Sequence, residues 1–151
     1  MKQLISLLII VKFFTSCGTK IPIQDFSVKI KHFYGAEGYT CIYYVNQDSL
    51  RISSSCDFTN CEDTTLYKIA LKKESVSEFY NYINDFDYEG LKDVYEPEEI
   101  ISYGHDVFVE IIGDSIPNKN INLFNYDLNE IKELIEEVDL LIPNKKYKFY
   151  N

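Results

Sequence analysis

Basic residues are scarce in this chain of 151 residues, where 15 Lys and Arg stand against 24 Asp and Glu for a formal net charge of −9. Nucleic-acid binding needs clustered Lys and Arg to neutralise phosphates, so the charge argues against a nucleic-acid partner. An acidic surface fits a basic protein partner, and it also keeps a domain soluble. The composition therefore favours protein partners over nucleic acids.

Long hydrophobic runs are missing as well. The apolar run from Leu4 to Val11 is eight residues long, whereas a helix that spans a bilayer needs about 20. The run is instead typical of the apolar part of an export signal.

Catalytic patterns are also missing. The chain contains no Gly-x-Ser-x-Gly elbow, no phosphate-binding glycine loop and no metal-spaced histidine pair. His32 and His105 are the two histidines. His105 precedes Asp106, but neighbours on a strand point to opposite faces, which excludes a catalytic dyad there. The sequence predicts a protein that is not an enzyme.

The N-terminus has the pattern of a secretory signal. Lys2 precedes the apolar run, and the small residues Thr15 and Ser16 precede Cys17. Removal of the signal takes away Lys2 and Lys12 but no acidic residue, so the mature domain is more acidic still. We expect a signal peptide at 1–16, a lipidated N-terminus and tether at 17–25, and a single domain at 26–151.

The segment Phe14-Thr15-Ser16-Cys17 resembles the relaxed lipobox of small Bacteroidetes-type lipoproteins. The strict lipobox has Leu where this chain has Phe14. The resemblance implies that Cys17 is acylated and that more than one acyl chain anchors the protein in a membrane, which a single chain does only marginally. It implies a cell-envelope location but carries no activity to transfer. Gly18-Thr19-Lys20 lacks the acidic cluster associated with surface export, so a periplasm-facing position is favoured over the cell surface.

Three cysteines remain once Cys17 is set aside, and thiols outside the cytoplasm tend to be oxidised. An odd number leaves one of them unpaired. Cys56 and Cys61 could close a small loop, and Cys41 with Cys56 could instead join neighbouring strands. A metal site is not expected, because the spacing lacks a tight chelating pair and no histidine lies nearby.

Hydrophobic periodicity predicts an α+β fold. Val76, Phe79, Tyr80 and Ile83 recur at helical spacing after a Ser75–Glu78 capping box. A second apolar stripe runs from Leu128 to Ile142, is expected to be capped by Asp127, and ends at Pro143. Alternation and apolar runs predict strands at 26–31, 39–45, 50–52, 66–71, 107–112 and 121–124. The order β-β-β-β-α-β-β-α indicates an antiparallel β-sheet with two amphipathic helices packed on one face.

The acidic stretch after the first predicted helix partly matches a calcium-binding loop. Lys92 stands where that loop has an aliphatic residue, and Pro97 disfavours the helix that should follow it. The alternative is a solvated acidic connector, and no other cofactor is expected. The candidate calcium ligands are Asp85, Asp87, Glu89, Asp93 and Glu96.

Tyrosine and phenylalanine are abundant, at 13 and 10 residues. Exposed aromatic side chains could stack on a sugar or anchor a protein interface. The candidates are Tyr44, Tyr88, Tyr95 and Tyr103. The other explanation for the abundance of aromatic residues is their propensity to form strands. We expect a non-catalytic envelope lipoprotein that binds a protein, for example an immunity-type inhibitor of a basic secreted toxin. The alternatives are a surface glycan- or calcium-binding lipoprotein and a cryptic enzyme.

Overall fold

A computed structural model describes residues 22–35, 38–56, 64–98 and 104–150. Its elements are β1 (Phe26–Tyr34), β2 (Tyr39–Asn46), β3 (Ser49–Cys56), β4 (Thr64–Ala70), α1 (Lys73–Asp85), β5 (Val94–Tyr95), β6 (His105–Gly113), β7 (Lys119–Phe124), α2 (Asn129–Leu140) and the 3-10 helix η1 (Lys145–Tyr147). Among these described residues, no helix has the length and apolar character needed to span a membrane.

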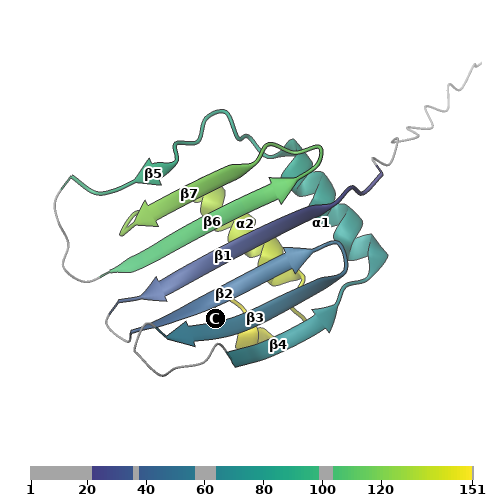
Figure 1. Cartoon of the computed structure of the whole chain (residues 1–151), viewed down its shortest axis with the longest axis horizontal. Helices are drawn as coiled ribbons and strands as arrows, with labels where there is room; N and C mark the ends of the chain where they lie inside the picture. Colours follow the sequence, from purple (N-terminus) through teal and green to yellow (C-terminus); the bar gives the residue numbers. More distant parts are fainter. Residues whose placement is uncertain (1–21, 36–37, 57–63, 99–103, 151) are drawn as a thin grey trace, which may run out of the picture.

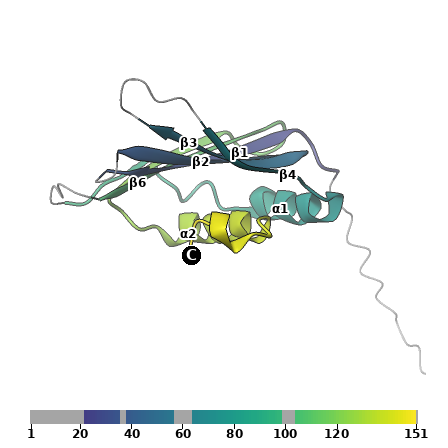
Figure 2. The same cartoon turned by 90° about the horizontal axis from the view of Figure 1, so that it is seen from below.

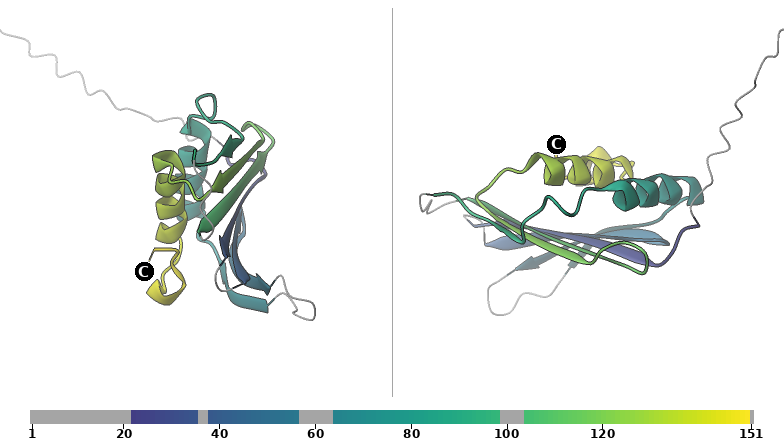
Figure 3. Two further views of the ribbon diagram at one scale, coloured as in Figure 1. Left: turned by 90° about the vertical axis from the view of Figure 1, so that its left-hand side faces the viewer. Right: turned by 90° about the horizontal axis from the view of Figure 1, so that it is seen from above.

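The strands form one sheet in the order β4-β3-β2-β1-β6-β7-β5 (Figure 1). All neighbouring strands are antiparallel except the short β5, which pairs in parallel with β7. Both helices pack on the same face of the sheet and leave the other face uncovered (Figures 2 and 3). The predicted α+β class and the predicted arrangement of the helices are confirmed.

Turn residues set the register of the first hairpins. The Asn46 side chain accepts hydrogen bonds from the backbone N–H groups of Asp48, at 3.0 Å, and Ser49, at 2.8 Å. These bonds tighten the turn between β2 and β3. Gly38, at the turn between β1 and β2, has a φ of 65°, which glycine adopts without steric cost.

The core lies between the sheet and the helices. Val76, Phe79, Tyr80 and Ile83 of α1 are buried, as are Ile131, Leu134, Ile135 and Val138 of α2. They pack in one cluster with buried strand residues such as Ile30, Val45, Ile52 and Ile111. Both predicted apolar stripes are therefore confirmed. Burial of these side chains is the main stabilising term of such a fold.

The predicted helix caps were wrong. Helix α1 begins at Lys73 after Lys72, and α2 begins at Asn129 after Leu128, and neither cap residue makes a side-chain cap bond. Ser75 lies inside α1, because the chain turns into the helix directly after β4, where the Leu71 N–H bonds to the Asp48 carbonyl. Neither helix therefore starts where its capping pattern predicts, and Leu128, directly before α2, packs against the core.

Two further differences concern strand length. Strand β3 continues to Cys56, beyond the predicted strand at 50–52, because β2 and β4 supply partners for its backbone along most of that length. The acidic connector contains β5, which was not predicted, because two residues carry no alternation pattern.

Candidate functional site

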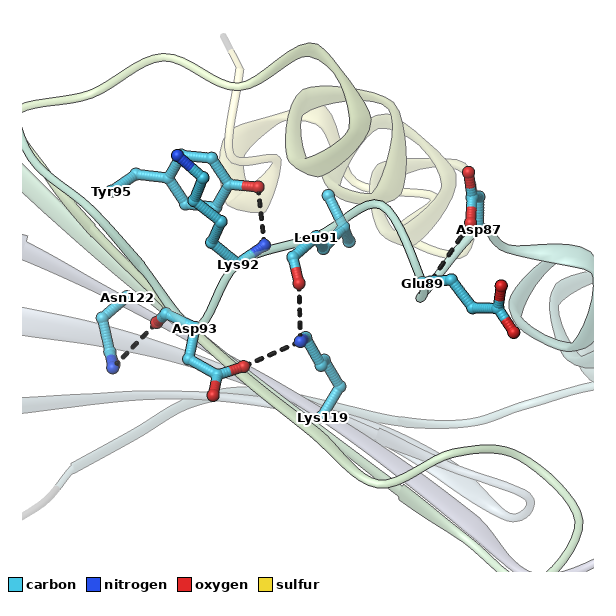
Figure 4. Close-up of polar contacts among 8 residues, drawn as sticks. All are labelled: Asp87, Glu89, Leu91, Lys92, Asp93, Tyr95, Lys119 and Asn122. Carbon is cyan, nitrogen blue, oxygen red and sulfur yellow. Dashed lines mark hydrogen bonds and ion pairs between the residues drawn. The ribbon is translucent and has the colours of Figure 1, made fainter.

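Three of the candidate calcium ligands, Asp87, Glu89 and Asp93, are spread along the connector (Figure 4). The Asp87 carboxylate accepts from the backbone N–H groups of Glu89, at 3.2 Å, and Gly90, at 3.4 Å, and so shapes a turn. Asp85 is exposed at the end of α1, and Glu96 is exposed beyond β5. Over the residues that the structure describes, no group of three His, Cys, Asp or Glu is placed to hold a metal ion. Calcium binding by these residues stays a prediction, and the described structure does not bring the candidate ligands together.

Lys119 of β7 ties the connector to the sheet. Its Nζ lies 2.7 Å from the Asp93 carboxylate and donates at 2.7 Å to the Leu91 carbonyl (Figure 4). The Asn122 backbone N–H donates to the Asp93 carbonyl at 2.9 Å. Asp93 is thus already paired with a cation, which a calcium ion would have to displace.

Replacing Lys119 with methionine is expected to lower the free energy of unfolding by about 1 kcal/mol. Most of the loss comes from the bond to the Leu91 carbonyl, because Asp93 has a 75% exposed side chain and its ion pair is screened by water. Urea denaturation measures the change. The exposed Lys132→Met is the control and should shift stability by less than about 0.5 kcal/mol; equal effects of the two substitutions would contradict the assigned role.

The structure describes only some of the cysteines for which predictions were made. Cys17 and Cys61 lie outside the described residues, and of Cys56 only the backbone position in β3 is described, opposite Tyr39. Cys41 carries a free thiol, so the Cys41–Cys56 pairing is not formed here. Burial raises the pKa of the Cys41 thiol, which makes it a poor nucleophile at neutral pH. The Cys56–Cys61 pairing stays a prediction.

The two histidines lie on the helix-covered side of the sheet. His32 is 7% exposed, and its ring stacks on Phe149 with 4.5 Å between centroids. Burial, with His105 nearby, lowers the pKa of His32 to about 4. His105 pairs with Tyr34 on this side, whereas its neighbour Asp106 belongs to the opposite face. The expected separation of His105 from Asp106 is observed.

The uncovered side of the sheet, called the open face below, presents side chains in rows across five strands. Cross-strand partners have Cβ atoms about 5 Å apart, so each row forms a continuous surface. In the order β3-β2-β1-β6-β7, the rows are Arg51, Tyr44, Lys29, Glu110 and Asn120; then Ser53, Ile42, Lys31, Phe108 and Asn122; then Ser55, Thr40, Phe33, Asp106 and Phe124.

A hollow of about 600 Å³ lies over the middle of the open face. It is lined by all members of the three rows except Arg51, Tyr44, Ser53 and Phe124. Lys29 and Lys31 project into it from the central strand β1 and form no ion pair within the described part of the chain. The hollow thus gathers amines, carboxylates, amides, hydroxyls and two phenylalanine rings on a rigid sheet.

The hollow was not predicted from the sequence. Of the tyrosines named as exposed, Tyr88 is buried, because its hydroxyl donates to the Ile83 carbonyl at the end of α1. Tyr95 packs on Tyr126 with 5.3 Å between centroids, and Tyr103 lies outside the described residues. Only Tyr44 lies on the open face, next to the hollow, where Arg51 stacks over its ring.

The signal that could have located the hollow is the polar half of the β1 alternation. Lys29, Lys31 and Phe33 alternate with buried residues and must share the face away from the core.

No protein-family model, no curated protein and no solved structure matches the chain. A function for the chain therefore has to follow from the chemistry of its own surfaces, and one of these is the hollow of about 600 Å³ on the open face.

Proposed function

We propose that the chain is a non-catalytic binding protein, exported and held at the cell envelope by a lipid on Cys17, and that its ligand binds on the open face of the sheet. The observation that carries the proposal is the hollow of about 600 Å³ on that face. Its volume falls within the range of about 300–1,000 Å³ typical of ligand sites.

The surroundings of the hollow support a binding role. A sheet with one face in water normally shows polar residues there, but this face also presents Phe33, Ile42 and Phe108. Two exposed apolar side chains lie elsewhere on this face: Ile112, beyond Glu110 on β6, is 45% exposed, and Val94, on the edge strand β5, is 46% exposed. Apolar groups gathered among polar ones on a surface mark an interaction site more often than scattered ones do.

The helix layer is the second candidate, for the basic protein partner that the net charge suggests. Burial and the nearby carboxylates of Glu133 and Glu137 raise the pKa of Tyr82 on α1 to about 12. Acidic side chains therefore line the junction of the two helices. The three rows of the open face contain Lys29, Lys31 and Arg51 against two carboxylates, so a basic partner fits the helix layer better.

A photo-crosslinking amino acid placed in the full-length chain separates the two candidates in living cells. We compare a probe at Ile112, on the open face, with one at Leu140, which is 72% exposed on α2. The proposal expects a discrete adduct from Ile112 that a Lys31→Glu substitution weakens. An adduct from Leu140 alone would favour the helix layer, and no adduct from Ile112 would overturn the open-face proposal.

The membrane anchor is tested separately. Cys17→Ser is expected to move the protein from the membrane fraction to the soluble fraction, because the acyl chains and not the acidic surface hold it at an anionic membrane. Immunoblotting of the fractions, with mass spectrometry of the N-terminal peptide, measures this. Cys41→Ser is the control, and a Cys17→Ser protein that stays in the membrane fraction would contradict lipidation.

A further inference from the structure

We infer that the hollow on the open face binds an uncharged saccharide. The inference rests on the proposed function, since it names the ligand class of the same face. Three properties of the hollow carry it: its charge balance, its hydrogen-bonding groups and its rings.

Charge in the hollow is balanced. Lys29 and Lys31 on β1 are matched by Glu110 and Asp106 on β6, and Lys29 and Glu110 are direct cross-strand partners. An acidic or a basic ligand would therefore meet as many like charges as opposite ones, and like-charge contacts at an interface are costly. The balance selects a ligand without net charge.

The hydrogen-bonding groups of the hollow are both donors and acceptors. Lysine ammonium groups only donate and carboxylates only accept, whereas amides and hydroxyls such as Asn122 and Thr40 do both. An apolar ligand would strip water from these groups without replacing their bonds, which costs binding free energy. A sugar hydroxyl both donates and accepts, so a ligand with many hydroxyls satisfies the whole set.

The rings supply the remaining contact. Phe33 and Phe108 lie in the hollow on the neighbouring strands β1 and β6. Phe108 is held edge-on by Phe124, at 5.6 Å between centroids and 82° between planes. A sugar ring has an apolar C–H face, which packs on an aromatic ring while its hydroxyls reach the polar groups around it. Because the sheet fixes the rings, little ordering is needed on binding.

The experiment is a screen of the purified mature chain, without its signal, on an array of neutral and charged glycans, followed by calorimetry. We expect at least one neutral glycan to bind. Phe108→Ala should weaken that binding by about tenfold or more, which corresponds to about 1.4 kcal/mol. Tyr126→Ala is the matched control: it removes an exposed aromatic ring that also contacts another ring, that of Tyr95, but does not line the hollow. It should change affinity by less than about twofold, and thermal melting of both variants checks that they fold alike.

Three results would overturn the inference: an array without neutral binders, binding of charged glycans alone, or equal losses in Phe108→Ala and Tyr126→Ala. Failure here is distinguishable from failure of the proposed function. An adduct from Ile112 in cells together with an empty neutral array would reject the saccharide and keep the open face as a binding surface. A glycan that binds Phe108→Ala with unchanged affinity would reject the hollow as the saccharide site, and the Ile112 probe would still decide whether the open face binds a ligand.

Discussion

Asp139→Ala is expected to lower the free energy of unfolding by about 3 kcal/mol and to release the C-terminal segment from the helix layer. Asp139 is 6% exposed, and its carboxylate accepts hydrogen bonds from the backbone N–H groups of Phe149, at 2.7 Å, and Tyr150, at 3.1 Å. A hydrogen bond to a charged group contributes about 1.5–3 kcal/mol, and two bonds that share one acceptor do not add fully. Urea denaturation and amide exchange at Phe149 and Tyr150 measure the two effects.

Glu133→Ala is the matched control for Asp139→Ala, because it removes an exposed carboxylate from the same helix. It should change the free energy of unfolding by less than about 0.5 kcal/mol and leave exchange at the C-terminal amides unchanged. If Asp139→Ala is no more destabilising than Glu133→Ala, the carboxylate does not hold the segment.

Acidification is expected to remove up to about 3 kcal/mol of stability through His32 alone. The pKa of His32 is lowered from 6.5 to about 4 in the folded protein, first by burial and then by His105. The unfolded chain therefore binds the proton more readily than the folded one. This stability is fully present above pH 6.5 and is lost as the pH falls towards 4. Nδ1 of His32 is buried and has no hydrogen-bond partner among the described residues, so the ring is held in its neutral form.

His32→Phe isolates this contribution, since it keeps a flat ring against Phe149 and removes the titrating group. Urea denaturation at several pH values between 7 and 4 compares the stability of the variant with that of the parent. The carboxylates are common to both proteins, so their contributions to the pH dependence cancel in the difference. The variant should lose about 3 kcal/mol less than the parent over that range. Equal losses would show that His32 is protonated in the folded state without penalty.

Both predictions concern one contact region at the end of the chain. Phe149 lies against His32 at 4.5 Å and against Tyr43 at 5.4 Å between centroids, and Asp139 fixes the backbone that carries it. Release of the segment would expose His32 to water. We therefore expect Asp139→Ala also to raise the pKa of His32 towards its ordinary value.

Much of the fold could be predicted from local pattern. The apolar spacing of α2 placed Ile131, Leu134 and Val138 in the core, because a 3.6-residue period puts them on one side of a helix. The side chain of Asn46 stabilises the turn between β2 and β3 by local chemistry of the same kind, because its hydrogen-bond partner Ser49 is three residues away. The helix starts were not predictable in this way, because the ends of strand β4 and of the segment before Asn129 are set by packing.

The hollow could be predicted only in part. Alternation along β1 places Lys29, Lys31 and Phe33 on one face. It does not say that Phe108 and Asp106 lie beside them, since these residues are more than 70 positions away in the sequence. Nor does it tell whether another layer covers that face. The open face exists only because β1 pairs with β6 and both helices pack on the other side.

The sequence by itself determined which side chains face the core, because period-2 and period-3.6 patterns act within a single element. Only the tertiary structure decided which strands are neighbours and which face stays open, as in the pairing of β1 with β6. That pairing depends on burying the apolar faces of every element at once, and no local stretch of sequence carries this information.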